Sequence, residues 1–461
     1  MKSFAALSRA FAETPLFSGK TWKVAAEAWR FSAEETRELN LIGDACLAFY
    51  RAQEKLYRAS ATGKSLLRNA PLYAPWVAEI LDRGKPARLV AHQRAHALAG
   101  TIPDVIRPDL LITENGFVLT ELDSVPGGIG LTAFLEEAYL GSTEMPERFF
   151  ASLVRGKSAL NIAVAVSDES ADYRPEFEYL AARVRRTCGA KISVCHPNEL
   201  SFSEDGVCLA GERVDVVYRF FELFDGANFP AQEKLMEAVE RGQVRVSPPM
   251  RAFQEEKMSL ALFRHPALEA FWRENLADAH RELLQKIIPA TWILEPVEAL
   301  PASALLWAPK PMRDWEALVV LPRRERNYVL KASGFCEEAW GARSVTVGDD
   351  ASQNEWRDAV ACALEAGRRD SLYVLQDFKK PSRVNFVVFD DAGTPVSVVG
   401  RVRICPYYFT GGGQAAHLSG ALATVCPADK KIIHGMRDAA LAPCVFDFNF
   451  SENCFHSRKR I

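Results

Sequence analysis

The sequence predicts an α+β fold that contains one parallel α/β unit, and three observations support this prediction. Residues 1–100 carry mostly helical periodicity, residues 161–195 alternate between strand and helix, and the chain after residue 327 is rich in short apolar strands. With 461 residues the chain is too long for one hydrophobic core. We therefore expect four parts: a helical N-terminal region (1–100), a hairpin-bearing part (101–155), a Rossmann-like unit (156–250) and a C-terminal part (251–461).

Composition and charge narrow the class of protein. Hydrophobic residues make up 48% of the chain and charged residues 25%, as in soluble globular proteins. A net charge of −3 gives no reason to expect a nucleic acid or an anionic membrane as a partner, and no apolar stretch is long enough to cross a bilayer. The ten cysteines show no C-x-x-C spacing, which argues against a zinc knuckle or a redox pair. We expect a reduced, cytoplasmic setting.

The first part of the chain predicts a long helix and then a β-hairpin. Ser32 and Glu35 have the spacing of a capping box, and the stretch "FSAEETRELNLIGDACLAFYRAQEKLYRAS" that they open keeps helical periodicity. Farther on, "DLLITENGFVLTELD" has two apolar strands around Asn115 and Gly116. Asn-Gly between apolar strands is the strongest short hairpin signal in the sequence.

The middle of the chain predicts a parallel unit. "NIAVAV", "RPEFEYLAARVRRT" and "KISVCHP" indicate a strand, a helix and a strand, and "VDVVYRFF" and "VRVSP" predict further buried strands. No G-x-G-x-x-G follows the first strand, so the dinucleotide fingerprint is absent. Residues 253–288 predict helices. After residue 327, "NYVLKAS", "LYVLQDF" and "VNFVVF" predict strands, and Ser352 with Glu355 begins a helix between the first two.

Two acids at the end of the hairpin raise the first functional question. Glu121 and Asp123 are two residues apart on a strand, so both project from one face. A three-residue loop over residues 114–116, with the glycine left-handed in a bulge, places Asp109 opposite Glu121 and Arg107 opposite Asp123. A two-residue Asn-Gly loop would put Asp109 on the other face. The first arrangement suits a magnesium site; the alternative is a solvated strand end.

A second set of residues points to nucleotide binding. Lys331 stands at a strand end before a loop that contains Gly334, where a lysine can bind phosphate as a point charge. Gln376, Asp377 and Phe378 follow another apolar strand directly, as in a hinge segment that holds an adenine edge with backbone groups. The simpler interpretation of Lys331 is a surface lysine before a turn.

The order of these motifs resembles the circularly permuted ATP-grasp proteins, the group that contains the glutathionylspermidine synthase-like ligases. The resemblance spans residues 100 to 415 approximately and rests on short motifs in the family's order: Arg107 and Asp109 (R-x-D), Glu121 and Asp123 (E-x-N/D), "VDVVYRFF" with Arg219, "QEEKMSLALF" with Lys257, "YVLKAS" with Lys331, and "YVLQDF" with Gln376. Two features depart from the family. Asp123 stands where the synthases commonly carry Asn, and Glu337 and Glu338 replace part of an expected Gly-rich run.

The resemblance implies a circularly permuted ATP-grasp fold, with a Rossmann-like pre-ATP-grasp unit and a nucleotide-binding lid in the C-terminal part. It implies an ATP- and Mg²⁺-dependent ligase that joins a small-molecule or peptide carboxylate to an amine through an acyl phosphate. The implied roles are these: Asp109, Glu121 and Asp123 bind Mg²⁺; Lys257, Lys331, Gly334, Gln376, Asp377 and Phe378 bind ATP; Arg107 and Arg403 are catalytic; and Arg219 binds substrate.

Two other classes of function remain open at this stage. The acids Glu337 and Glu338 beside a phosphate loop favour a non-catalytic nucleotide-binding scaffold, because carboxylates repel a triphosphate. The stretch "ELD" beside a Rossmann-like unit also suits a metal-dependent glycosyltransferase, although that class gives Lys331 and Gln376 no role.

Overall fold

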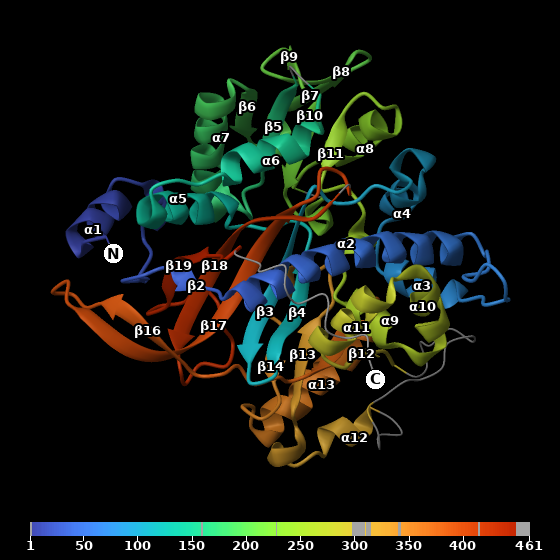
Figure 1. The fold of residues 1–461 in the computed structure, drawn as a ribbon. Helices are drawn as coiled ribbons and strands as arrows, with labels where there is room; N and C mark the ends of the chain where they lie inside the picture. The colour runs from blue at the N-terminus through green and yellow to red at the C-terminus, as the bar shows by residue number, and fades with distance from the viewer. Residues whose placement is uncertain are drawn as a thin grey trace, which may run out of the picture.

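The computed structural model describes residues 2–157, 160–226, 228–296, 309, 315–339, 343–413 and 415–448. Within these ranges the fold is a mixture of helices, one parallel sheet and antiparallel or mixed sheets. Figure 1 shows the parallel sheet above the largest sheet and a small sheet below it. This arrangement confirms the α+β class.

The large sheet joins the two ends of the described chain to the predicted hairpin. Its strands lie in the order β1-β19-β18-β17-β3-β4, with β16 also paired to β17 and β2 to β19. Their bounds are β1 (Lys23–Val24), β2 (Trp29–Arg30), β3 (Val105–Thr113), β4 (Gly116–Asp123), β16 (Val384–Phe389), β17 (Pro395–Phe409), β18 (His417–Pro427) and β19 (Ala440–Val445). The hairpin β3–β4 therefore shares one sheet with strands some 280 residues farther along the chain.

The register of the hairpin confirms the predicted pairing but not the predicted loop. Thr113 pairs with Gly116, which leaves a turn of two residues, and Gly116 has φ +95°. The register then shifts beyond Asp109, where Thr120 is the extra residue of a bulge. The shorter turn alone would shift the register by one residue and place Asp109 on the other face. The bulge reverses that shift, so that Asp109 pairs with Glu121 and residue 107 pairs with residue 123.

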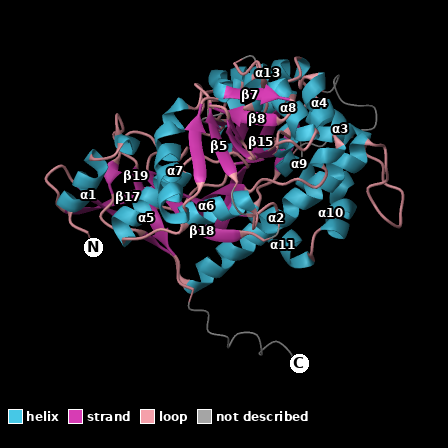
Figure 2. Cartoon of the chain, turned by 90° about the horizontal axis from the view of Figure 1, so that it is seen from above, coloured by secondary structure: helices cyan, strands magenta, loops and turns pink. Residues whose placement is uncertain are grey.

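Helices cover one face of the large sheet. Helix α2 (Ala33–Ala61) begins at the predicted capping box and crosses the sheet in Figure 1. It approaches closely at Gly43, where a Cβ would overlap the ring of Tyr408 on β17. Figure 2 shows α2 together with the helices at one end of the molecule, namely α3 (Pro75–Asp82), α4 (Ala87–Arg94), α9 (Met258–Arg264), α10 (Glu269–Asn275) and α11 (Asp278–Ile287). None of the helices in the described ranges combines the length and apolar character needed to cross a membrane.

The parallel sheet has the order β11-β10-β5-β6, and all of its neighbouring strands are parallel. Its strands are β5 (Asn161–Val166), β6 (Lys191–Cys195), β10 (Val216–Phe220) and β11 (Arg245–Ser247), and its helices are α5 (Ile129–Leu140), α6 (Met145–Val154), α7 (Arg174–Cys188) and α8 (Gln232–Glu240). The predicted strand-helix-strand order over residues 161–195 is confirmed. A three-stranded sheet, β7 (Leu200–Ser203), β8 (Gly206–Leu209) and β9 (Glu212–Arg213), follows β6.

The small sheet is antiparallel and has the order β12-β15-β13-β14. Its strands are β12 (Thr291–Leu294), β13 (Tyr328–Ala332), β14 (Thr346–Val347) and β15 (Tyr373–Asp377). Helix α13 (Gln353–Arg368) begins at the predicted capping box of Ser352 and buries Trp356 against this sheet; a short helix, α12 (Glu316–Val319), packs on α13. Lys331 thus lies inside β13 rather than on a surface turn.

Candidate active-site cavity

A cavity of about 1040 Å³ is lined by residues of the large sheet, of the small sheet and of the segments at the edge of the parallel sheet. Ten of the residues that the sequence singles out line it: Arg107, Asp109, Glu121, Asp123, Lys257, Lys331, Gln376, Asp377, Phe378 and Arg403. Arg219 and Gly334 do not. Residues as far apart in the chain as Arg107 and Arg403 therefore share one cavity.

The floor of the cavity is one face of the large sheet. Arg403 on β17 pairs with Leu111 on β3 and with Thr424 on β18, and Thr424 pairs with Leu441 on β19. All four line the cavity, because paired residues project from the same face. The next cavity residue on β17 is Cys405, whose Sγ donates to Asp109 Oδ1 at 3.4 Å.

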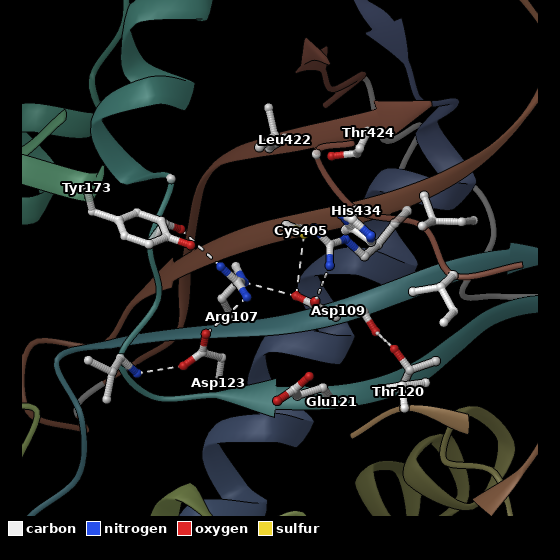
Figure 3. A pocket seen from close by; sticks show the side chains of 18 of the residues that line it. Arg107, Asp109, Thr120, Glu121, Asp123, Tyr173, Cys405, Leu422, Thr424 and His434 are labelled. Carbon is white, nitrogen blue, oxygen red and sulfur yellow. Dashed lines mark hydrogen bonds and ion pairs between the residues drawn. The ribbon is translucent and has the colours of Figure 1, made fainter. Parts of the chain in front are cut away.

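Arg107 and Arg403 neutralise the acids at the centre of this floor. Arg107 Nε lies 2.9 Å from Asp109 Oδ1 and its Nη2 lies 3.0 Å from Asp123 Oδ2, while Arg403 Nη1 lies 2.9 Å from Asp109 Oδ2. Figure 3 shows Asp109 and Asp123 on either side of Arg107. Burial raises the pKa of Asp109, but the two guanidinium groups outweigh it and bring the pKa below its ordinary value.

Asp123 has the opposite shift. Burial and the neighbouring charge of Glu121 raise its pKa above the ordinary value, although Arg107 lowers it. Its Oδ1 also accepts the N–H of Val125 at 2.8 Å, which fixes the carboxylate at the strand end. Asp109 and Asp123 are therefore held by partners within the protein rather than solvated at a strand end.

Two lysines approach the hairpin from the other side of the cavity. Lys257 Nζ lies 2.9 Å from Glu121 Oε1 and donates to the carbonyl O of Ala339 at 3.0 Å. Lys331 Nζ donates to the carbonyl O of Thr120 at 3.1 Å and to Gln376 Oε1 at 3.0 Å. Burial opposes the charge of Lys257, but Glu121 keeps its pKa above the ordinary value. Burial, with the charge of Lys257, lowers the pKa of Lys331 to about 8.

The hinge segment differs from the expectation in how it can contact a ligand. Gln376 lies in the middle strand of the small sheet, paired with Thr291 and Val329, so its backbone is used by the sheet. The N–H of Asp377 donates to Ala290 O and that of Phe378 to Asn327 O, each at 2.8 Å. The side chains of these residues line the cavity, but their N–H groups do not face an adenine edge. These N–H groups are therefore already used within the protein, and ATP binding by Gln376, Asp377 and Phe378 stays a prediction.

Arg219 is part of the protein interior, which corrects its assignment to substrate binding. The residue is 0% exposed, forms an ion pair with Glu255, and donates from Nη1 to the carbonyl O of Phe221 at 2.6 Å. Strand β10 is buried on both faces, so its guanidinium group requires an internal partner.

Gly334 also lies away from the cavity. It lines a much smaller void with Lys85 and Phe335, and a Cβ on it would lie 2.9 Å from Glu256 Oε2. The two acids of the following loop are outside the cavity lining as well, since Glu337 pairs with Arg343 and Glu338 is exposed. The acidic loop therefore does not place carboxylates where Lys257 and Lys331 point.

The three carboxylates do not form a metal site as they stand. In the part of the chain that the structure describes, no group of three or more His, Cys, Asp or Glu side chains is arranged to hold a metal ion. The physical reason is that Asp109 and Asp123 face Arg107 and Glu121 faces Lys257. The side chain of Glu121 is 40% exposed and that of Asp123 is 27% exposed, and both line the cavity.

Several cavity residues were not found from the sequence. Tyr407 donates to the carbonyl O of Gly127 at 2.8 Å, and Arg107 Nη1 donates to the same oxygen at 3.0 Å. Glu176 accepts the N–H groups of Gly128 and Leu131 at the start of α5, at 2.7 and 3.2 Å, and burial raises its pKa to about 7. The alternation of "RVRICPYYF" contained a signal for Cys405 and Tyr407, which lie two and four residues after Arg403 on one strand face.

Comparison with protein-family models gives no match, and comparison with curated proteins gives none either. Among solved structures, the chain is similar to a glutathione synthetase-like effector from Globodera pallida in its apo form, with 14% identity, a TM-score of 0.53 and coverage of 96% of both chains. A weaker likeness is to a putative gamma-glutamylcysteine synthetase from Methylobacillus flagellatus KT, with 11% identity, a TM-score of 0.41 and coverage of 78% of this chain and 84% of that chain. Another is to a carboxyaminoimidazole ribonucleotide synthase from Aspergillus clavatus complexed with ATP, with 13% identity, a TM-score of 0.27 and coverage of 63% of this chain and 71% of that chain. The first likeness shows a shared fold over almost the whole chain, and the other two are too weak to carry an argument.

Proposed function

We propose that the protein is an ATP- and Mg²⁺-dependent carboxylate–amine ligase of ATP-grasp type. The observation that carries the proposal is the convergence of four cations on one hairpin inside one cavity: Arg107, Arg403 and Lys257 contact its acids, and Lys331 contacts the carbonyl O of Thr120. These cations come from four separate chain segments, so no local pattern places them together. Preorganised positive charge around a cavity is what phosphoryl transfer to a carboxylate requires.

Each set of residues has a distinct task in this reaction. Lys257 and Lys331 would hold the phosphates of ATP, while the side chains of Gln376, Asp377 and Phe378 would border the base. Arg107 and Arg403 would hold the acid so that its oxygen faces the γ-phosphorus. That oxygen attacks, ADP leaves, and an acyl phosphate forms. An amine then attacks the carbonyl carbon, loses a proton and displaces inorganic phosphate, which leaves an amide.

Hard carboxylate oxygens suit Mg²⁺, and of the three predicted ligands Glu121 and Asp123 are the residues that would hold it once their ion pairs open. The ion would supply neutralisation of the phosphate charge. The partly exposed side chains of Glu121 and Asp123 support this role; Asp109, which two arginines already neutralise, would mainly orient those arginines.

Fold likeness supports the proposal in a limited way. The structure with the shared fold carries a glutathione synthetase-like name, and synthetases of that kind join a carboxylate to an amine. The hairpin precedes the small sheet in the chain, which agrees with the circularly permuted order expected from the sequence motifs.

The decisive experiment is ADP release from Mg-ATP by the pure protein, screened against pairs of acids and amines. With an active pair, Glu121→Gln should abolish turnover, because it removes the charge that a hard cation needs but keeps size and hydrogen bonding. Glu114→Gln, in the exposed turn of the same hairpin, is the matched control and should turn over normally. If Glu121→Gln turned over as fast as the unmodified protein, the magnesium assignment would be wrong.

A second candidate is a nucleotide-binding scaffold without catalysis. It is favoured by the ion pairs that already occupy the three carboxylates. The ADP-release screen separates the two candidates, because a scaffold binds Mg-ATP but releases no ADP with any pair. Calorimetry tests both at once, since a protein that binds no ATP fits neither candidate.

A further inference from the structure

Part of the cavity wall is apolar, and beside it Lys20 and Asp172 form an ion pair at 3.7 Å. Six residues, all of which line the cavity and belong to one cluster of contacting side chains, define what we term the apolar chamber: Trp22, Val125, Leu131, Tyr173, Leu422 and Leu441. Figure 3 shows Tyr173 and Leu422 on the opposite side of Arg107 and Asp109 from Thr120, to whose carbonyl Lys331 donates. The chamber and the proposed phosphate site are therefore at different ends of the cavity.

The chamber is built by rigid elements rather than by loops alone. Leu422 and Leu441 rise from neighbouring strands of the large sheet, β18 and β19, and both are largely buried. Leu131 comes from α5, which contacts both strands and is anchored to Glu176 through the N–H groups of Gly128 and Leu131. Trp22 packs on the segment between β18 and β19, since a Cβ on Gly435 would lie 3.4 Å from its ring.

A cationic group lies directly beside this chamber. Arg403, Thr424 and Leu441 form one row across the sheet, so the guanidinium group and the chamber are neighbours on the same face. Arg403 Nη1 is paired with Asp109, whereas its buried Nε has no hydrogen-bond acceptor among the described residues. The Arg403 side chain as a whole is 23% exposed and lines the cavity, so a ligand carboxylate can approach its guanidinium group there.

We propose that the acid substrate is amphiphilic: its carboxylate binds at Arg403 and an aliphatic or aromatic hydrocarbon group fills the apolar chamber. The proposal rests on the ligase function proposed above and adds the substrate class to it. A hydrophilic acid would leave its polar groups without partners against Leu131, Leu422 and Leu441, which disfavours it. A hydrocarbon group instead gains from leaving water, by roughly a fourfold increase in affinity for each buried methylene.

The test is a series of acids bound to the full chain. Butanoate, pentanoate, hexanoate and heptanoate are titrated by calorimetry with Mg²⁺ and a non-hydrolysable ATP analogue present, and again without nucleotide. We expect affinity to increase roughly fourfold with each methylene and hexanoate to bind more tightly than gluconate, which has the same number of carbons. Arg403→Gln should weaken the whole series by a similar factor and leave its slope unchanged.

Two variants on one helix locate the effect. Leu131→Gln should flatten the chain-length dependence, whereas Leu140→Gln, at the exposed end of α5, should leave it unchanged. A flat series in the unmodified protein, with gluconate binding as tightly as hexanoate, overturns the apolar chamber as a substrate site and leaves the ligase proposal standing. A steep series without any ATP binding has the opposite meaning: the chamber holds such acids and the ligase proposal fails.

Discussion

At the residue scale, an arginine on a strand can either line the cavity or neutralise an acid in the protein interior, depending on which residues surround it. Arg403 and Arg219 both lie on buried strands and both pair with a carboxylate, yet only Arg403 faces the cavity. Sequence patterns could not separate the two arginines, because every residue of β10 is buried and strand alternation carries no information there. The consequences of substitution should differ accordingly.

The main effect of Arg219→Ala should be a loss of fold stability rather than a loss of ligand affinity. The substitution leaves Glu255 buried without its partner, and breaking a buried ion pair costs about 3–5 kcal/mol. Arg148→Ala, which removes an exposed pair with Glu144, is the control and should change the unfolding free energy by about 1 kcal/mol or less. Urea unfolding measures both. A variant at Arg219 that kept full stability but lost ligand affinity would restore its assignment to substrate binding.

Lys331 should make ATP binding depend on pH. Its pKa is lowered to about 8 by burial and by Lys257, and a phosphate group favours the ammonium form. Below that pH the lysine is already charged; above it, binding must take up a proton, so affinity should fall by up to tenfold per pH unit. Calorimetry in buffers of different ionisation enthalpy measures both the affinity and the proton uptake. Lys331→Arg does not titrate in this range and should remove the dependence; an affinity independent of pH in the unmodified protein would contradict the assignment.

At the scale of elements, the hairpin shows what could be predicted from sequence and what could not. The existence of the hairpin was predictable because Asn115-Gly116 lies between two apolar strands, whereas the predicted pairing of Asp109 with Glu121 holds only because a bulge offsets the shorter turn. The two-residue turn and the bulge at Thr120 were not predictable, since "LTEL" has no Gly or Pro to mark a bulge. The contact of Arg403 with Asp109 was unpredictable for another reason: it depends on which strands of the large sheet are neighbours, and no local pattern encodes that.

Helix α5 is the element on which the position of Arg107 depends. The helix begins beside Gly127, whose carbonyl accepts from Arg107, and it packs so closely on α7 that a Cβ on Gly130 would overlap the carbonyl O of Glu176. Gly130→Ala should therefore push α5 away from α7 at a cost of about 1–3 kcal/mol, and it should reduce ligand affinity because Arg107 loses its support. Leu140→Ala on the same helix is exposed and should have little effect on either measure. Differential scanning calorimetry and ligand titration together check this; an unchanged melting temperature would show that the two helices can separate freely.

At the scale of the whole molecule, the cavity exists only because three sheets meet. The floor comes from the large sheet, Lys331 and the hinge side chains from the small sheet, and Tyr173 with the residues after β10 from the parallel unit. The α+β class and most elements followed from periodicity and capping signals in the sequence. The ATP-grasp assignment, the four-part division of the chain and the cytoplasmic setting stay predictions, because they depend on relationships between elements or on surroundings that the fold alone does not report.

A ligand that contacts all three sheets should stabilise the molecule as a unit. Binding to the folded state alone raises stability by RT ln(1 + [L]/Kd), which is about 2.7 kcal/mol at a hundredfold excess of ligand over Kd. Mg-ATP should therefore raise the melting temperature steadily with the logarithm of its concentration, and adding an acid that occupies the apolar chamber should raise it further. Lys331→Gln should shift this dependence to higher nucleotide concentrations. It should not lower the melting temperature of the ligand-free protein, because the variant no longer buries a charged ammonium group. A melting temperature that does not respond to Mg-ATP at any concentration would mean that the convergence of lysines and arginines in this cavity serves a ligand other than ATP.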